Sequence, residues 1–291
     1  MSCVSPILVK NGIGSVKAPC GRCLSCCIAK QSALTFLCQK ELQAVYKRGL
    51  GASFVTLTYN DSAVPYVDNS PYMSLRKADL QKYLKRLRRY VERSNLPPIK
   101  FLACGELGDT LGRPHYHLVL FGLSDALAQD FTRKAWNKDE KGLSQIGALS
   151  SGGLRYVLKY MTKSRKDREA EKVYDTLGVE KPFITHSQKL GFDWIYNHAR
   201  EIAESGYLIG TPSKKFLAPK YVRDVVERLT GVDPRPCVLN YLNGINTRGE
   251  NLDDYLARMT YIKELDLKNK QIQSHNAYLM PIHYRKPREL R

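Results

Sequence analysis

His115 and His117 open the apolar, β-branched stretch RPHYHLVLFG, residues 113–122. If this stretch is a strand, its side chains alternate between two faces, so both imidazoles emerge on one face and Tyr116 on the other. Two imidazoles on one face converge on a common point. The stretch therefore predicts a core strand whose first half carries two candidate ligands of a metal ion.

A second apolar stretch, IKFLACGE (residues 99–106), ends in a carboxylate and precedes the turn-rich segment 108–114. Two strands joined by such a turn form a hairpin, which brings Glu106 alongside His115 and His117. Two imidazole nitrogens and one carboxylate oxygen leave positions open for a substrate oxygen, which suits a divalent ion at a reactive site. The competing interpretation is that the histidines are half-buried and make ordinary hydrogen bonds.

A tyrosine-bearing segment, RYVLKYMTK, spans residues 155–163. On a helix, residues four apart lie one turn above each other, so Tyr156 and Tyr160 project from one side with Lys159 beside them. A phenol, with a pKa of about 10, is a weak nucleophile at neutral pH, so attack on a phosphodiester needs a cation to polarise the phosphate. Opposite a metal site, this helix predicts a covalent phosphotyrosine; the competing interpretation is that its tyrosines are core residues.

Four ordered motifs carry a family resemblance: FVTLTY at 54–59, Gly105-Glu106, the triplet 115–117, and Tyr156-x-x-Lys159-Tyr160. Together they resemble the HUH-superfamily rolling-circle replication initiation proteins, and within these the proteins of microviruses, in particular the gokushovirus branch of single-stranded DNA phages. The likeness runs from about residue 19 to residue 163. It implies an α+β fold with an antiparallel sheet and flanking helices, with the metal on the central hairpin.

The resemblance also implies an activity. Proteins of this family nick one DNA strand at the origin through a tyrosine, stay on the 5′ phosphate, leave a 3′ hydroxyl that primes synthesis, and later rejoin the strand. It assigns catalysis to Tyr156, Tyr160 and Lys159, and a Mg²⁺ or Mn²⁺ ion to His115, His117 and Glu106. Thr56 and Thr58, on one face of the first motif strand, and Arg113 are expected near the bound DNA.

The net charge points to a polyanionic partner. Lys and Arg number 46 against 28 Asp and Glu, which gives a formal charge of +18 and favours nucleic acid, here single-stranded and origin DNA. An amphipathic helix is expected from residue 75 onward with Ser74 as its N-cap. Its exposed side is almost uniformly basic and includes Lys85, Arg88 and Arg89 as candidate phosphate contacts, although a charged face is common on any exposed helix.

No apolar run approaches the roughly 20 residues that cross a bilayer, and the N-terminus does not look like a signal peptide. We therefore expect no membrane partner and a location in the host bacterial cytoplasm. No Walker-type phosphate loop is present, so we expect a host helicase, together with a host polymerase, as partners.

Eight cysteines are crowded toward the front of the chain. The spacing Cys20-x-x-Cys23-x-x-Cys26 predicts a structural Zn²⁺ site, completed by Cys3, Cys27 or Cys38. The standard second pair of a zinc knuckle is missing, so small buried thiols on a helix are an equally good interpretation.

The remaining pattern predicts a division into an N-terminal arm and helix (1–50), an endonuclease core (51–165) and a mainly helical, basic region (166–291). Within these segments we expect further elements, as follows: one strand near 7–9, a helix over 25–47, a strand over 53–59, a loop over 60–74, a helix from Ser124 with a good cap, and helices over 193–204, 219–229 and 252–272.

Three other functions remain open. A relaxase or transposase would use the same chemistry, a basic nucleic-acid-binding protein would hold a structural ion without catalysis, and a zinc hydrolase would cleave through activated water without a covalent adduct.

Overall fold

A computed structural model describes residues 3–11, 14–108, 112–137, 141–149, 154, 156–159, 168–211, 214–246, 260, 261, 263–265, 267, 268 and 271. These residues form two compact units. We call residues 45–188 the sheet unit and residues 1–44 with 189–271 the cysteine unit. The predicted division at residues 50 and 165 remains a prediction about the sequence.

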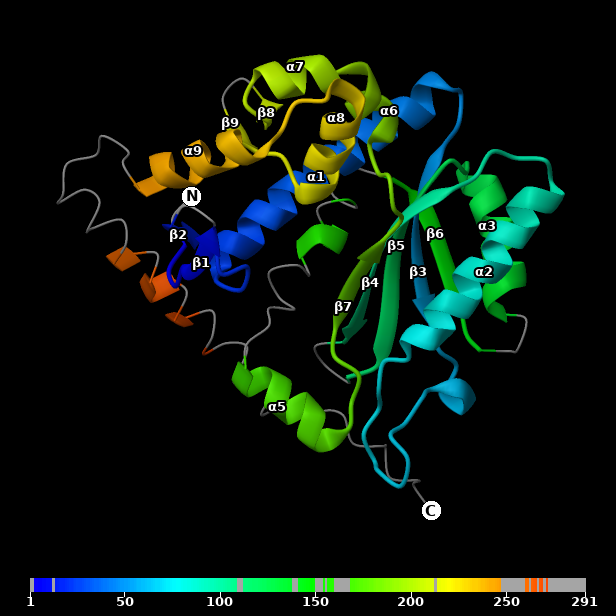
Figure 1. Cartoon of the computed structure of the whole chain (residues 1–291). Helices are drawn as coiled ribbons and strands as arrows, with labels where there is room; N and C mark the ends of the chain where they lie inside the picture. Colours follow the sequence, from blue (N-terminus) through cyan, green and yellow to red (C-terminus); the bar gives the residue numbers. More distant parts are fainter. Residues whose placement is uncertain are drawn as a thin grey trace. The chain divides into compact units, whose positions relative to one another are not determined.

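The sheet unit is built on five antiparallel strands in the order β6-β3-β5-β4-β7 (Figure 1). The strands are β3 (Ala52–Thr58), β4 (Lys100–Leu107), β5 (Pro114–Phe121), β6 (Ser144–Ala148) and β7 (Phe183–His186). The strand that carries the histidines, β5, is therefore central, paired with β3 on one side and β4 on the other. This confirms the predicted class, an antiparallel sheet with flanking helices.

Two helices, α2 (Lys77–Arg93) and α3 (Asp125–Trp136), lie side by side against one face of the sheet (Figure 1). The predicted apolar stripe of α2, which includes Leu80 and Leu87, is buried there together with Leu118 and Leu120 of β5. Burial of a Leu side chain contributes about 1.5–3 kcal/mol. The apolar face of α2 thus fixes which face of the sheet stays available for chemistry.

A buried polar network fastens β5 to the start of α2. The Tyr116 hydroxyl lies 2.9 Å from both the backbone nitrogen and the carbonyl oxygen of Arg76, and 2.9 Å from the hydroxyl of Tyr59. Tyr59 in turn donates to the buried carboxylate of Asp79 at 3.0 Å. Burial raises the pKa of Tyr116 to about 12, so this phenol stays protonated and able to donate.

The structure corrects the predicted start of α2. Ser74 is not the N-cap, because the helix begins at Lys77 and Arg76 holds the N-cap position without a side-chain capping bond. The Ser74 hydroxyl instead accepts from the backbone nitrogen of Glu180, 106 positions further along the chain, and donates to the carbonyl of Leu75. A long-range contact has replaced the local one.

Other differences lie at the edges of the sheet unit. The edge strands β6 and β7 were not predicted, and the 60–74 loop contains a short 3₁₀ helix, η1 (Asp61–Ala63), and an isolated bridge between Tyr66 and Met73. Ser124 precedes α3 as expected but makes no side-chain capping bond. Helix α5 (Arg168–Leu177) leads into β7.

The cysteine unit contains the long helix α1 (Leu24–Lys47), as predicted. Its other elements are β1 (Ile7–Asn11), β2 (Gly14–Ala18), α6 (Phe192–Asn197), α7 (Ala199–Glu204), β8 (Leu208–Thr211), β9 (Lys214–Leu217), α8 (Lys220–Thr230) and α9 (Arg235–Asn246). The N-terminal arm is a hairpin rather than one strand, and the helix predicted over 193–204 is two short helices. The hairpin β8-β9 and the helix α9 were not predicted.

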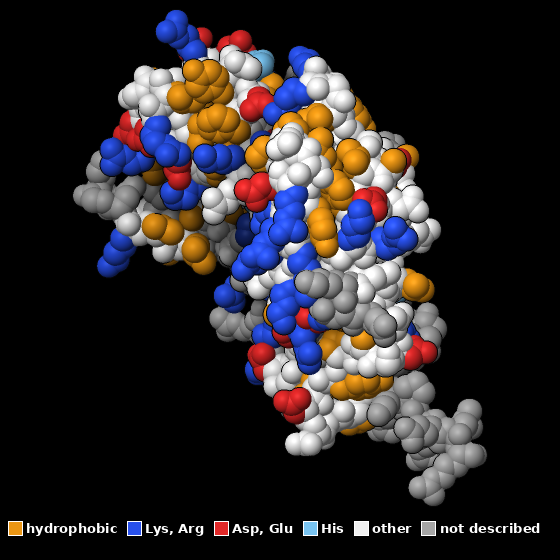
Figure 2. All heavy atoms as spheres, turned by 90° about the vertical axis from the view of Figure 1, so that its right-hand side faces the viewer, with side chains coloured by type: hydrophobic (Ala, Val, Ile, Leu, Met, Phe, Trp, Pro, Cys, Tyr) orange, Lys and Arg blue, Asp and Glu red, His pale blue; other side chains and the backbone are white. Residues whose placement is uncertain are grey.

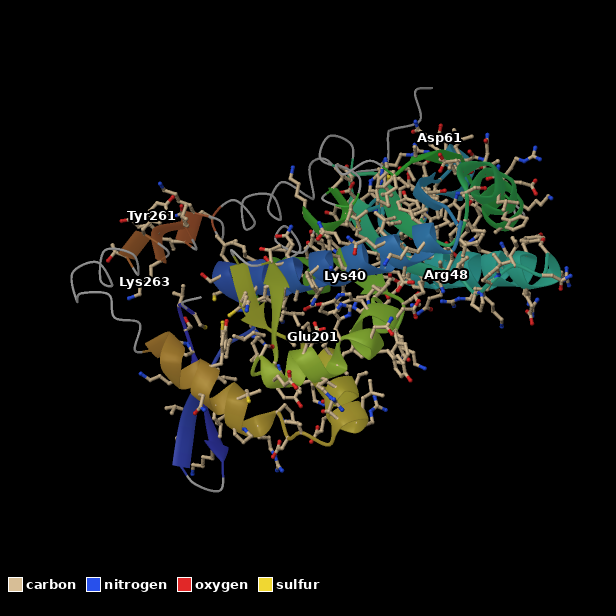
Figure 3. All side chains as sticks on the ribbon, turned by 90° about the horizontal axis from the view of Figure 1, so that it is seen from above. Lys40, Arg48, Asp61, Glu201, Tyr261 and Lys263 are labelled. Carbon is tan, nitrogen blue, oxygen red and sulfur yellow. The ribbon has the colours of Figure 1, made fainter. Side chains whose placement is uncertain are left out.

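Aromatic packing holds the elements of the cysteine unit together. Phe36 of α1 packs edge-on against Trp194 of α6 and Phe216 of β9, with ring centroids 4.9 and 6.1 Å apart. Lys40, labelled on α1 in Figure 3, places its ammonium 5.1 Å from the Phe36 ring and 5.2 Å from the Trp194 ring. Of the helix predicted over 252–272, the described residues are helical and the others lie outside the described part of the chain. None of the described helices has the length and hydropathy needed to cross a bilayer.

Candidate active site

The alternation of β5 places His115 and His117 on one face and Tyr116 in the core behind them, as predicted. On the neighbouring strands, His117 is opposite Thr56 of β3 and Cys104 of β4, while His115 is opposite Thr58 and Glu106. Directly opposed residues share a face of the sheet, so the imidazoles, the carboxylate and both threonines emerge together.

His117 is held by two partners. Its Nε2 lies 2.8 Å from Oε1 of Glu106 and its Nδ1 lies 3.1 Å from the hydroxyl of Thr56. A carboxylate only accepts, so Nε2–H donates to Glu106 and the Thr56 hydroxyl serves Nδ1. Because a hydroxyl both donates and accepts, Thr56 can support His117 with or without a cation at Nε2. The imidazole is only 7% exposed, which fixes its orientation.

His115 has a defined tautomer. Its Nδ1 lies 2.5 Å from the carbonyl oxygen of Arg113, which can only accept, so Nδ1 carries a proton. Burial lowers the pKa of His115, which favours the neutral ring. The Nε2 atom of a neutral ring with a protonated Nδ1 carries a lone pair. His115 is therefore prepared to donate that lone pair to a cation, and a backbone carbonyl at the other nitrogen is the usual support of such a ligand.

These three side chains fit a divalent cation. The imidazole rings of His115 and His117 lie 6.3 Å apart between centroids and are nearly parallel, and the Glu106 carboxylate already contacts one of them. Nitrogen and oxygen donors of this kind are shared by manganese, zinc and other divalent ions. The donor set and the tautomer of His115 are both compatible with the predicted metal.

Tyr156 comes to the same carboxylate from the far side in sequence. Residues 156–159 are helical, and the Tyr156 hydroxyl donates to Oε1 of Glu106 at 3.4 Å. Its ring stands edge-on to His117 with centroids 5.0 Å apart, and the side chain is 40% exposed. Tyr156 is thus neither sealed in the core nor remote from the imidazoles. Lys159 is exposed on the same helical segment, whereas Tyr160 lies outside the described residues.

Phe54 is a site residue that the sequence motifs did not single out. Its ring stacks on His117 at 5.9 Å and meets the Tyr156 ring edge-on at 6.1 Å. The strand period places it on the same face as Thr56, so alternation from Thr56 could have found it. Phe54 links the tyrosine segment to the histidine strand.

The other predicted DNA contacts are dispersed. Arg113 is engaged within the protein, donating to Asp61 at 2.5 Å and to the carbonyl of Tyr59 at 2.6 Å. The Thr58 hydroxyl donates to the carbonyl of Leu143 at 3.4 Å. Both residues lie near the histidine end of β5, where Arg113 pins the loop that follows β3.

The basic residues of α2 lie behind the sheet, on the face opposite the histidines. Lys85, Arg88 and Arg89 are exposed or half-exposed, and the Arg88 guanidinium lies 5.5 Å from the Phe101 ring. Figure 2 shows Lys and Arg side chains gathered on the side of the molecule that α2 forms. These charges can hold DNA near the protein, but they do not reach the imidazole face.

The predicted zinc ligands Cys3, Cys20, Cys23 and Cys26 come together within the cysteine unit. They belong to a different unit from the histidines and Glu106, so the two candidate metal sites are distinct.

Comparison with known proteins places the histidine site in a family context. Residues 52–165 match a family model of replication-associated proteins, the ORF2 type. This range contains β3 to β6, both histidines, Glu106 and Tyr156.

Three curated phage proteins are similar over about three quarters of the chain. The replication-associated protein ORF2 of Spiroplasma virus 4 is 29% identical over 75% of this chain and 70% of its own length. The replication-associated protein ORF4 of Chlamydia phage 1 is 25% identical, covering 75% and 56%, so the chain spans little more than half of that relative. The replication-associated protein VP4 of Bdellovibrio phage phiMH2K is 21% identical, covering 74% and 69%.

Among solved structures, the N-terminal nuclease domain of minute virus of mice non-structural protein 1 is 10% identical, covers 56% of this chain and 83% of that domain, and gives a TM-score of 0.23. A score of this size supports no argument about fold or activity. The sequence matches carry the conclusion: residues 52–165 belong to the ORF2 family of replication-associated proteins, and the resemblance to the replication initiation proteins of small phages is confirmed.

Proposed function

We propose that this protein initiates phage DNA replication as a metal-dependent, site-specific endonuclease that nicks one strand of the viral origin through a tyrosine. The observation that carries the proposal is the shared oxygen of Glu106. Oε1 accepts from the Tyr156 hydroxyl at 3.4 Å and from His117 Nε2 at 2.8 Å. A nucleophile and a ligand set that meet at one atom are the arrangement that phosphodiester cleavage requires.

In the cleavage step, the Tyr156 phenol oxygen attacks the scissile phosphorus and the bond from phosphorus to the 3′ oxygen breaks. The 3′ oxygen takes up a proton and leaves as a free hydroxyl, while the 5′ phosphate stays on the tyrosine. The phenol proton has an acceptor at hand in the Glu106 carboxylate, to which the hydroxyl already donates. Rejoining is the reverse: a 3′ hydroxyl attacks the phosphotyrosine and releases the phenol.

His115, His117 and Glu106 would hold the cation. When bound, it supplies Lewis-acid polarisation of the phosphate and offsets the charge that develops in the transition state. We propose Mg²⁺ or Mn²⁺ as the physiological ion; the two imidazoles favour Mn²⁺ in affinity, whereas Mg²⁺ prefers oxygen ligands.

The second tyrosine extends the reaction to repeated rounds. In a helix that continues from Tyr156, Tyr160 would lie one turn further on the same side. It would attack the regenerated origin while the first tyrosine releases its strand, and Lys159 would contact the phosphate or the nucleophile. The exposed position of Lys159 supports such a contact.

The proposed partners follow from this activity. The protein would bind single-stranded and origin DNA in the cytoplasm of the host bacterium, and the new 3′ end would be extended by a host polymerase behind a host helicase. The formal charge of +18 supports a DNA partner.

The decisive test is a covalent adduct. Purified protein is incubated with a 5′-labelled or 3′-labelled single-stranded origin oligonucleotide and Mn²⁺, then run on a denaturing gel. We expect the label on the 3′ side of the nick to migrate with the protein. Tyr156→Phe together with Tyr160→Phe should abolish nicking and leave origin binding intact. Tyr196→Phe removes an exposed tyrosine of the cysteine unit and serves as the matched control.

Each alternative has its own outcome in this test. Undiminished nicking by the double variant refutes the tyrosine mechanism, and cleavage without an adduct indicates a hydrolase that uses water. Binding without cleavage indicates a non-catalytic DNA-binding protein. An adduct formed with plasmid transfer origins or transposon ends, but not with the phage origin, indicates a relaxase or transposase.

The metal is tested separately. A chelator should stop cleavage and added Mn²⁺ should restore it, while His115→Ala together with His117→Ala should remain inactive at any Mn²⁺ concentration. Full activity in that double variant would contradict the assigned ligands.

A further inference from the structure

Four thiols converge at the base of the N-terminal hairpin. The Sγ atoms of Cys3, Cys20, Cys23 and Cys26 all lie within 4.8 Å of one another. The Cys23 and Cys3 sulfurs are 3.8 Å apart and the Cys20 and Cys26 sulfurs are 4.0 Å apart. Figure 3 shows yellow sulfur atoms gathered beside the beginning of α1.

These separations suit a shared cation. A tetrahedral zinc ion with bonds of about 2.3 Å to four sulfurs keeps the sulfurs roughly 3.8 Å apart. A disulfide needs a separation of about 2.05 Å, and all four cysteines are free thiols. Thiols that merely fill a core have no reason to point at one centre.

The backbone around the sulfurs supports thiolate ligands. The backbone nitrogens of Arg22 and Cys23 donate to Cys20 Sγ at 3.4 and 3.3 Å, and the nitrogen of Cys20 donates to Cys3 Sγ at 3.2 Å. Gly21 allows the tight turn between Cys20 and Cys23 because its φ is +73°. Amide hydrogens aimed at sulfur stabilise negative charge there and orient the ligands.

We propose that Cys3, Cys20, Cys23 and Cys26 bind one structural zinc ion as thiolates. Four protein ligands fill the tetrahedron and leave no position for a substrate, so the ion takes no part in strand cleavage. The inference does not rest on the proposed function, because its ligands belong to a different unit from the histidine site.

The ion would close the hairpin. Cys3 precedes β1, Cys20 follows β2, and Cys23 and Cys26 lie at the beginning of α1. A two-stranded hairpin is at best marginally stable alone, and Leu8 of β1 is 71% exposed, so this hairpin has little apolar burial of its own. Zinc would therefore fasten both ends of the hairpin to α1.

The chain offers a matched control in Cys27. It follows Cys26 directly on α1 and is also buried, but its thiol donates to the carbonyl of Arg22 and it is not a member of the four-thiol cluster. Cys23→Ser and Cys27→Ser thus make the same chemical change one helical turn apart, inside and outside the proposed site.

Zinc content is measured by elemental mass spectrometry on protein purified under reducing conditions. We expect one equivalent of zinc in the unchanged protein, in Cys27→Ser and in His115→Ala with His117→Ala, and a loss in Cys23→Ser. In cobalt-substituted protein, the thiolate charge-transfer and tetrahedral ligand-field bands should appear and should be absent from Cys23→Ser. Retention in the histidine variant separates this site from the proposed catalytic ion.

A second measurement covers a variant that fails to fold. Chelation of zinc from the unchanged protein should speed tryptic cleavage after Lys10, Lys17 and Arg22, and added zinc should restore protection. Zinc-free protein with four titratable thiols, disulfides among the four cysteines, or full zinc in Cys23→Ser would overturn the proposal, as would cleavage at these positions that chelation leaves unchanged.

Discussion

The Tyr156 hydroxyl donates to Oε1 of Glu106 at 3.4 Å, although 50 positions separate the two residues. Glu106 reaches this point from β4, and Tyr156 reaches it from a helical segment after the edge strand β6. The contact joins the two chemical halves of the candidate site, the proposed nucleophile and the ligand set. Neighbouring side chains hold both halves in place, and each of these supports can be removed by a single substitution.

Thr56→Val should weaken metal binding. The substitution keeps the shape of the side chain but removes the hydroxyl 3.1 Å from His117 Nδ1, which supports the ligand tautomer. Loss of such a support typically costs a factor of about 10 to 100 in metal affinity. The measurement is a calorimetric Mn²⁺ titration, with Thr35→Val as control because that hydroxyl donates to the Gln31 carbonyl of α1. An unchanged dissociation constant in Thr56→Val would show that the hydroxyl plays no part.

Phe54→Ala should slow adduct formation without changing metal affinity. The ring contacts Tyr156 and His117 but offers no ligand atom, and an aromatic contact is worth about 0.5–1.5 kcal/mol, or roughly a two- to tenfold change in rate. Single-turnover kinetics with the origin oligonucleotide measures the effect. Phe54→Tyr keeps the ring and should recover the rate; a failure to recover it would assign the loss to something other than ring contact.

Tyr116→Phe should lower the free energy of unfolding by about 1–3 kcal/mol. The change strands the buried backbone groups of Arg76 and removes the neighbour of the Tyr59 hydroxyl, and unmet buried hydrogen bonds carry that cost. Urea denaturation followed by circular dichroism gives the value, and Tyr46→Phe, at a 52% exposed position, is the control. Equal stability of the two variants would mean that solvent replaces the lost partner.

Replacement of Lys85, Arg88 and Arg89 by Gln should reduce the salt dependence of DNA binding. Each phosphate contact to a single strand contributes about 0.7 to the slope of log affinity against log salt, so losing three lowers the slope by about 2. Fluorescence anisotropy at several salt concentrations measures it. The control is Arg133→Gln with Lys134→Gln, since both charges pair with Asp130 of α3. If the two slopes agree, the α2 charges are an ordinary solvated surface.

The features predicted well from sequence depend on strict periodicity. The two-residue period of β5 places His115 and His117 together and buries Tyr116, and the helical period of α2 selects its buried stripe. Both patterns are local and repeat several times, so they determine a face without knowledge of the rest of the fold. The spacing of Cys20, Cys23 and Cys26 is similarly local, and the structure adds Cys3 from beyond the hairpin.

The features that were missed depend on distant partners. Strand β6 has the sequence SQIGA and is largely exposed, and β7 has only four residues, so neither carries a pattern long enough to identify a strand. Ser74 has the composition of an N-cap, yet its hydroxyl is used by Glu180. Phe54 is indistinguishable from an ordinary core residue until the rings of His117 and Tyr156 are placed against it.

The strand order has one more consequence. β6 and β7 occupy opposite edges of the sheet, and the chain between them contains Tyr156. The tyrosine segment is therefore a strap buckled at both borders, and neither border strand carries the histidines or Glu106. A DNA end bonded to Tyr156 could be carried a short way from the ligand set and brought back while the three central strands stay intact, so one protein molecule could guard a broken strand throughout a round of copying.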